Sequence, residues 1–271
     1  MAYQFITAEI RGHIDYITLN RPEKLNALSM TFQEELIDAM QAAEADNEVR
    51  VIVLQANGRA FCAGYDISEH ADRAEKTTNN IRVDIQNMRQ TVGRWDSVWN
   101  LSKPIVAGVQ GYCLAGGADL AMHCDVIIAA DDAMFGYPTV RTQGSPPTHM
   151  WTYLVGPQWA KYLLLTGNSI DGKTAERIGL IWKAVPSEKL TEEVNAVASV
   201  MAKIPWELLA ANKSICNKAI EMMGRGLVQQ LAAESNAIAH LAPIVDEFRR
   251  LSREQGLKAA VQWRDAPFKE S

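Results

Sequence analysis

Two glycine-rich segments of the sequence could do chemistry with their backbones. Residues 58–67 and 111–120 each follow a short apolar strand, and the second segment opens a predicted helix. Glycine permits positive φ and lets a ligand approach the main chain closely. The N–H groups of Gly116 and Gly117 lie at the helix N-terminus, where donors lack intrahelical partners and negative charge is favoured. Two such turns directed at one point would form an oxyanion hole for an enolate or a tetrahedral intermediate. Ordinary strand-to-helix turns share this composition, so the pattern alone leaves both interpretations open.

Composition excludes several other functions. The chain has 271 residues and a net charge of −5, which gives no electrostatic footprint for nucleic acid or for an anionic membrane surface. The dinucleotide pattern GxGxxG and the phosphate-loop pattern GxxxxGK[ST] are both absent. No apolar run is long enough to span a bilayer, and the first residues lack the layout of a signal peptide. The scattered cysteines form neither a CxxC pair nor a disulfide framework, so we expect reduced thiols and a cytoplasmic protein; they are Cys62, Cys113, Cys124 and Cys216.

The elements that must position these turns alternate between strand and helix. Residues 2–20 predict two strands with a turn near Gly12, and Ser29 is a plausible N-cap for a helix over residues 29–46. Apolar strands at 51–54 and at two later sites, 105–109 and 126–130, alternate with helical segments. This order predicts an α/β fold with a largely buried sheet.

The strand signal stops near Pro186. Short helices are predicted over 157–166 and 173–179, and later ones over 190–203, 205–223, 226–240 and 243–256. We therefore predict an α/β core over residues 1–200 and a C-terminal helical region over residues 201–271.

Five segments of the sequence, in this order, carry a resemblance to a known family. They read NRPEKLNAL (20–28), AFCAGYDI (60–67), KPIVAGVQGY (103–112), AGGADLAMHCD (115–125) and LTG (165–167). Together they resemble the enoyl-CoA hydratase/isomerase (crotonase) family. The resemblance implies a crotonase-like spiral of ββα units that forms two roughly perpendicular sheets. It also implies a C-terminal helical trimerisation segment, an acyl-CoA thioester as substrate, and a homotrimer or hexamer. We expect no metal and no cofactor beyond the coenzyme A of the substrate.

The resemblance also assigns positions to the site. By it, the backbone N–H groups of Tyr65 and Gly116 would hold the thioester oxygen, and the ring of Tyr65 would lie near the acyl chain. The positions that match coenzyme A contacts in the family are Arg21, Lys24, Ala63, Asp66, Ile67, Phe268 and Lys269. A solvated surface charge is an equally good interpretation for Lys24.

The acid and base positions depart from the family pattern. Hydratases of the family use two glutamates that hold a water molecule and pass its proton. Asp119 stands at the first position, one methylene shorter, and Thr139 stands at the second. A hydroxyl is a poor acid or base near neutral pH. A carboxylate in the first turn of a helix would also complement the helix dipole, which is the structural alternative for Asp119.

The segment after Thr139 also differs from the family's glycine-rich loop. Arg141 could pair with a substrate carboxylate or with Asp119, and Tyr137 could donate a hydrogen bond or simply pack. His149 could titrate near neutral pH, although a structural histidine is the commoner case. Two further candidates are Glu69 and His70, for which a solvated helix start is the alternative.

The leading hypothesis is an enoyl-CoA hydratase-type lyase that acts through an enolate held by Tyr65 and Gly116, with Asp119 moving the proton. One alternative is an isomerase or another atypical crotonase reaction, because a single base can remove and return a proton. A second alternative is an acyl-CoA-binding protein with little catalysis. The sequence leaves the acyl group open.

Overall fold

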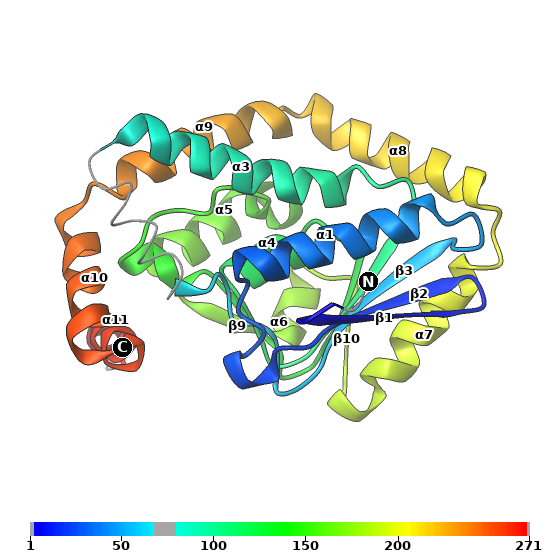
Figure 1. Cartoon of the computed structure of the whole chain (residues 1–271), viewed down its shortest axis with the longest axis horizontal. Coiled ribbons are helices and arrows are strands. Elements are labelled where there is room, and N and C mark those ends of the chain that lie inside the picture. The colour runs from blue at the N-terminus through cyan, green and yellow to red at the C-terminus, as the bar shows by residue number, and fades with distance from the viewer. Residues whose placement is uncertain (1–2, 68–79, 270–271) are drawn as a thin grey trace.

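Two β-sheets form the centre of the protein in a computed structural model that describes residues 3–67 and 80–269 (Figure 1). The larger sheet has six strands in the order β1-β2-β3-β5-β7-β10, and the smaller sheet has four in the order β4-β6-β8-β9. The larger sheet contains β1 (Ile6–Arg11), β2 (Ile14–Leu19), β3 (Val51–Ala56), β5 (Ile105–Val109), β7 (Val126–Ala130) and β10 (Lys183–Val185). The smaller sheet contains β4 (Ala60–Cys62), β6 (Tyr112–Leu114), β8 (Met134–Gly136) and β9 (Ser169–Asp171).

The chain enters the two sheets in turn. Strands β3, β5 and β7 of the larger sheet are each followed directly by a short strand of the smaller sheet, namely β4, β6 and β8. Neighbouring strands pair in parallel from β2 to β10 and from β4 to β8, while β1–β2 and β8–β9 are antiparallel. A helix follows each strand pair, as right-handed crossovers between parallel strands require. This is the predicted spiral of ββα units.

Helices lie on both faces of the larger sheet (Figure 1). Before the C-terminal region they are α1 (Met30–Ala45), α3 (Ile81–Trp99), α4 (Gly116–Ala121), α5 (Trp151–Thr166), α6 (Gly172–Arg177) and α7 (Leu190–Met201). Three short 3-10 turns lie among them, η1 (Pro22–Lys24), η2 (Pro138–Arg141) and η3 (Ser187–Lys189). The candidates Glu69 and His70 lie outside the described residues.

The N-terminal elements form where local chemistry predicts them. Gly12 connects β1 and β2 with φ of 60°, a conformation that glycine adopts without strain. The Ser29 side chain accepts a hydrogen bond from Phe32 N and so caps α1. The apolar face of α1 is buried against the sheets through Phe32, Leu36 and Met40.

The central strands are apolar because both faces of the larger sheet are covered. Every residue from Val51 to Leu54 is fully buried. Val53 and Val106 pack on one face against α7, whereas Ile52 and Leu54 belong to the core on the other face. Because these strands are buried on both faces, their positions in the sheet are fixed. The glycine-rich turns of the candidate site follow these strands and are positioned by them.

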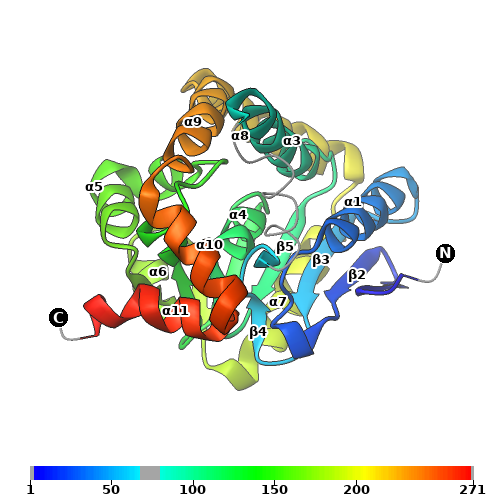
Figure 2. The same cartoon turned by 60° about the vertical axis from the view of Figure 1, so that its left-hand side comes forward.

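A helical tail runs around the core (Figures 1 and 2). It comprises α8 (Trp206–Met222), α9 (Arg225–Ala239), α10 (Pro243–Gln255), α11 (Leu257–Asp265) and η4 (Ala266–Phe268). The helix α11 lies within the predicted helical region over residues 201–271, but the last separate helix that the pattern predicts ends at residue 256. In α5, Gly156 has φ of 71° and interrupts the helix just before Pro157, so the predicted helix over 157–166 is only its second half.

Candidate active site

The two glycine turns meet in the structure. Strands β4 and β6 pair in parallel, which brings the turns that follow them side by side. A Cβ atom added to Gly117 would lie 2.3 Å from the carbonyl oxygen of Cys62, and one added to Gly64 would lie 3.1 Å from the Cβ of Ala115. Gly117 therefore allows a close approach of the two backbones that a side chain would prevent.

Tyr65 and Gly116, the two predicted donors, lie together at this junction. Gly116 is the first residue of α4, so its N–H lies outside the ladder of intrahelical bonds. The Tyr65 ring lies over Gly116, because a Cβ added there would be 2.8 Å from Cε2 of the ring. On the other side, Leu28 N donates to the carbonyl oxygen of Gly64 at 2.8 Å, which fixes the first turn against the start of α1.

Asp119 lies in the first turn of α4, fully buried beside this junction. Its Oδ2 atom accepts hydrogen bonds from the hydroxyls of Tyr65, at 3.0 Å, and Tyr137, at 3.1 Å. Its Oδ1 atom accepts from the hydroxyl of Thr148 at 2.6 Å. A further bond leads outward, since Trp95 Nε1 donates to the Tyr65 hydroxyl oxygen at 2.8 Å.

The surroundings of Asp119 move its pKa towards neutrality. Burial removes water from the carboxylate and raises the pKa from its usual range to about 6. The hydroxyls of Thr148, Tyr65 and Tyr137 stabilise the charged form and limit the rise. A carboxyl group with such a pKa can accept and release protons near neutral pH.

Thr139, which stands at the second acid/base position of the family, does not bond Asp119. It lies in η2, and the hydroxyl groups that bond the Asp119 carboxylate belong to Tyr65, Tyr137 and Thr148. The sequence left two roles open for Tyr137, a hydrogen-bond donor or a packing residue. Tyr137 has both roles, because its side chain is 4% exposed and its hydroxyl donates to Asp119. Thr148 was missed by sequence reasoning. It stands in the altered loop, where nothing in the local pattern indicates that it reaches α4.

Arg141 does not form an ion pair with Asp119, and its side chain bonds residues away from the glycine turns. Its guanidinium donates to Asp265 Oδ1 at 3.1 Å and to Asn168 Oδ1 at 3.0 Å. The same group lies 3.9 Å from the centre of the Phe268 ring. Arg141 therefore connects η2 to the end of the helical tail.

His149 stands in the altered loop with φ of 49°. Its Nδ1 atom is buried without a hydrogen-bond partner among the residues that the structure describes. Burial lowers the pKa of His149 and so favours the neutral ring. The ring lines an apolar cavity of about 400 Å³ between the loop and the tail, together with Leu164 and Ile244. A second cavity, of about 370 Å³, is lined by Arg141 and Arg264.

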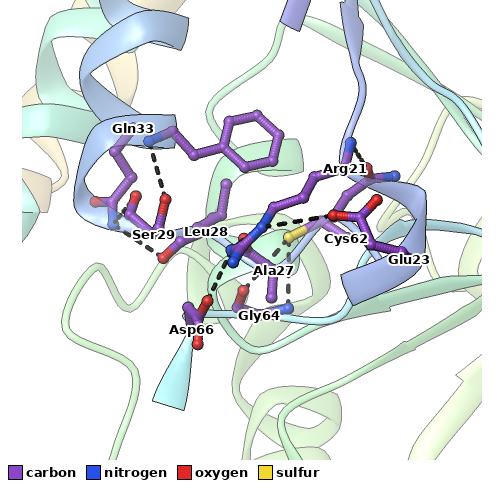
Figure 3. A network of polar contacts seen from close by, with 11 residues as sticks. Arg21, Glu23, Ala27, Leu28, Ser29, Gln33, Cys62, Gly64 and Asp66 are labelled. Carbon is purple, nitrogen blue, oxygen red and sulfur yellow. Dashed lines mark hydrogen bonds and ion pairs between the residues drawn. The ribbon is translucent and has the colours of Figure 1, made fainter. Parts of the chain in front are cut away.

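Four of the predicted coenzyme A positions lie in or beside the first glycine turn, and Figure 3 shows two of them, Arg21 and Asp66. Arg21 Nη1 donates to Asp66 Oδ2 at 2.7 Å and to the carbonyl oxygen of Ala27 at 3.0 Å. Ala63 N donates to the carbonyl oxygen of Leu25, and Ile67 packs against the tail at Phe248. Arg21 and Asp66 thus hold each other in place.

The remaining three coenzyme A positions lie at the surface. Lys24 in η1 is exposed, and Phe268 and Lys269 are exposed at the end of the tail beside Arg141. Within residues 3–67 and 80–269, no group of three or more His, Cys, Asp or Glu side chains could hold a metal ion. In the same ranges, no helix combines the length and apolar character needed to cross a membrane.

In this chain a strand of the larger sheet is followed by a strand of the smaller sheet and then by a helix, and this unit repeats. That arrangement places the chain in the class of crotonase-fold proteins. The chain belongs to the Enoyl-CoA hydratase/isomerase family, whose sequence model matches residues 9–271. It is therefore a crotonase-type enzyme that acts on acyl-CoA.

Relatives match over nearly the whole chain. A probable enoyl-CoA hydratase of Rhizobium meliloti (strain 1021) is 34% identical over 273 residues and covers 99% of both chains. The 2,3-dehydroadipyl-CoA hydratase of Escherichia coli (strain K12) is 31% identical, over 93% of this chain and 94% of its own. The crystal structure of an enoyl-CoA hydratase from Mycobacterium smegmatis has a TM-score of 0.92 at 34% identity, with 97% of this chain and 94% of that chain covered.

Proposed function

We propose that this enzyme adds water to the double bond of an enoyl-CoA thioester through an enolate. In this reaction the thioester oxygen accepts hydrogen bonds from the N–H groups of Tyr65 and Gly116. These donors stabilise the negative charge that develops on the oxygen when the α-carbon gains electron density. The helix dipole of α4 adds to this stabilisation, because Gly116 is its first residue.

Asp119 is the group that moves the proton. It takes a proton from the attacking water and returns one to the α-carbon of the enolate. The main support for this role is the Asp119 carboxyl group itself. It is fully buried beside both glycine turns, and its pKa is raised to about 6. A carboxyl group with an ordinary pKa would be a weaker base towards the water proton.

Double-bond isomerisation is a second candidate function. The second glutamate of the family pattern is replaced by Thr139, and the hydroxyls that bond Asp119 carry no charge. A 1,3-proton shift requires one base, which removes a proton from one carbon and returns it to another. Asp119 alone meets that requirement.

Product analysis tests these candidates. Purified protein is incubated with crotonyl-CoA and with longer 2-enoyl- and 3-enoyl-CoA esters, and the products are followed by mass spectrometry. A gain of one water that is lost in Asp119→Asn, with ester binding retained, is the expected result. A double-bond shift without added water supports the isomerase. Tight binding without turnover would contradict both reactions and leave a binding protein.

We also infer that the helical tail assembles the protein into a homotrimer or hexamer. Large apolar side chains on the tail are exposed in the single chain, among them Ile215, Met222, Leu227, Leu231, Ile238 and Leu241. A surface of this kind is typical of a protein–protein interface. Native mass spectrometry tests the inference. A protein that remains monomeric at micromolar concentration would contradict it.

A further inference from the structure

The buried position of Asp119 raises the question of how its carboxylate exchanges a proton with the substrate. Its side chain has no contact with solvent, and three hydroxyl groups occupy positions around its two oxygens. A substrate carbon at the glycine turns therefore has to exchange its proton with Asp119 across one of these hydroxyls, or one of them has to move away.

The three hydroxyl residues differ in where they lie. Thr148 is fully buried and Tyr137 is 4% exposed, so both lie within the core. Tyr65 is partly exposed, and its ring lies over Gly116, the residue whose N–H we assign to the thioester oxygen. Tyr65 is thus the one of the three whose ring contacts the glycine turn at which we place the thioester oxygen, while its hydroxyl bonds Asp119.

We propose that the Tyr65 hydroxyl is a further catalytic residue, which relays the proton between the substrate and Asp119 and takes the place of the family's second carboxylate. This inference rests on the proposed function, because it assumes that Asp119 is the proton carrier.

The hydrogen bonds of Tyr65 are arranged in a chain. Trp95 Nε1 can only donate, and it donates to the Tyr65 oxygen, so the Tyr65 proton is directed to Asp119 Oδ2. The bond from Trp95 also stabilises negative charge on the phenol oxygen while its proton is in transit. Trp95 is fully buried in α3, which fixes the direction of this bond.

Each relay step balances in atoms and charge. As a proton leaves the substrate or water, a new O–H bond forms at the Tyr65 oxygen, and the former hydroxyl proton of Tyr65 moves to Asp119 Oδ2. The phenol is regenerated and the carboxylate becomes a carboxylic acid. In the return step, Asp119 gives its proton back to the Tyr65 oxygen while Tyr65 gives its own to carbon. No oxidant or reductant is required.

The groups around the relay favour a neutral phenol. Burial and the neighbouring Asp119 raise the pKa of Tyr65 well above its usual value. Within residues 3–67 and 80–269, the other titratable groups beside Asp119 include the Tyr137 phenol on the β8 side, the Cys62 thiol at the end of β4 and the Cys113 thiol in β6, and burial raises the pKa of each. These three groups are therefore neutral at pH 7.

Two matched variants test the relay. Tyr65→Phe and Tyr137→Phe each remove one phenol hydroxyl from the same carboxylate oxygen and keep the ring. The assay follows exchange of the α-protons of butyryl-CoA in D₂O by NMR, which isolates the proton transfer from water addition. We expect Tyr65→Phe to slow exchange by about 100-fold or more and Tyr137→Phe by at most about ten-fold, with ester binding kept in both.

Two results would overturn the relay. One is exchange in Tyr65→Phe within about ten-fold of the wild-type rate. The other is an equal loss in both variants, because the phenols would then act only as hydrogen-bond donors to Asp119. Asp119→Asn separates this failure from failure of the proposed function. If exchange continues in Asp119→Asn, the proposed proton carrier itself is wrong.

A measurement on the wild-type protein tests the relay even if a variant does not fold. The release of tritium from α-tritiated butyryl-CoA is measured in H₂O and in D₂O. In the relay the Tyr65 hydroxyl proton, which comes from solvent, moves in the same step as the proton on carbon, so the release should be slower in D₂O. Equal rates in the two solvents, which indicate that no solvent-derived proton is in transit, would contradict the relay.

Discussion

Asp119 and Asp125 are two aspartates near the end of α4 that differ in burial and in what surrounds them, since Asp119 is fully buried and the Asp125 side chain is 18% exposed. Asp125 Oδ2 accepts hydrogen bonds from Lys213 Nζ at 2.7 Å and from Ile105 N at 2.7 Å. Among the residues that the structure describes, the side chains that bond the Asp119 carboxylate are neutral hydroxyls. Burial raises the pKa of both carboxyl groups, but the lysine opposes the rise at Asp125.

The difference separates a structural role from a chemical one. The ammonium group of Lys213 also donates to the carbonyl oxygen of Lys103, so this pair ties α8 of the tail to the start of β5. A fixed cation holds its partner in the ionised form. Hydroxyl groups stabilise the charge without fixing it, and they leave Asp119 able to change its protonation state at neutral pH.

The largest expected effect comes from breaking the structural pair. Lys213→Met leaves the partly exposed Asp125 carboxylate without its cation, which costs up to about 4 kcal/mol of unfolding free energy. Urea unfolding measures this change. Lys218→Met is the matched control, because Lys218 is an exposed residue on the same helix. Equal stability of the two variants would contradict a structural role for the pair.

A smaller effect comes from the proton on Asp119. Its folded pKa of about 6 lies above the unfolded value of about 3.9, so the folded state binds this proton more tightly. The resulting stabilisation is fully present below pH 4 and is lost as the pH rises through 6, in total roughly 3 kcal/mol. Urea unfolding at pH 5 and pH 8 should show wild type losing stability relative to Asp119→Asn. Parallel pH dependences in the two proteins would contradict the raised pKa.

The smallest effect concerns the hydroxyls themselves. Tyr137→Phe removes a donor that stabilises the ionised carboxylate, so the pKa of Asp119 should rise by up to about one unit. The acid limb of the pH profile of kcat/KM should move upward by the same amount. Tyr162→Phe is the control, because the Tyr162 hydroxyl bonds Asn168 at the surface. An unmoved limb in Tyr137→Phe would show that its hydroxyl does not influence the carboxylate.

The long elements of the fold are predictable from the sequence, whereas the smaller sheet is not. Helix α1 has a capping serine and an apolar face, and β3 is a continuous apolar run. Strands β4, β6 and β8 have three residues each, too few for any periodicity to emerge. Only the family resemblance implied that a second sheet exists.

The site divides in the same way. Asp119, Tyr65 and Gly116 lie in motifs that the sequence displays, so their proximity could be expected. Thr148 and Trp95 come from distant segments whose local pattern indicates only a loop and an apolar helix face. Their contacts depend on how the loop after η2 and helix α3 pack around α4. Such packing is a property of the whole chain and carries no local signal.

The pH dependence of kcat/KM on an enoyl-CoA ester, compared between wild type and Asp119→Asn, tests the assignment of Asp119 most directly. The carboxylate must be ionised to accept a proton, so wild-type kcat/KM should rise as the pH increases through about 6. Asp119→Asn should lose activity by about 100-fold or more at every pH and lack this limb. A wild-type profile that is flat between pH 5 and pH 7, or an Asp119→Asn variant with the same limb, would contradict the account.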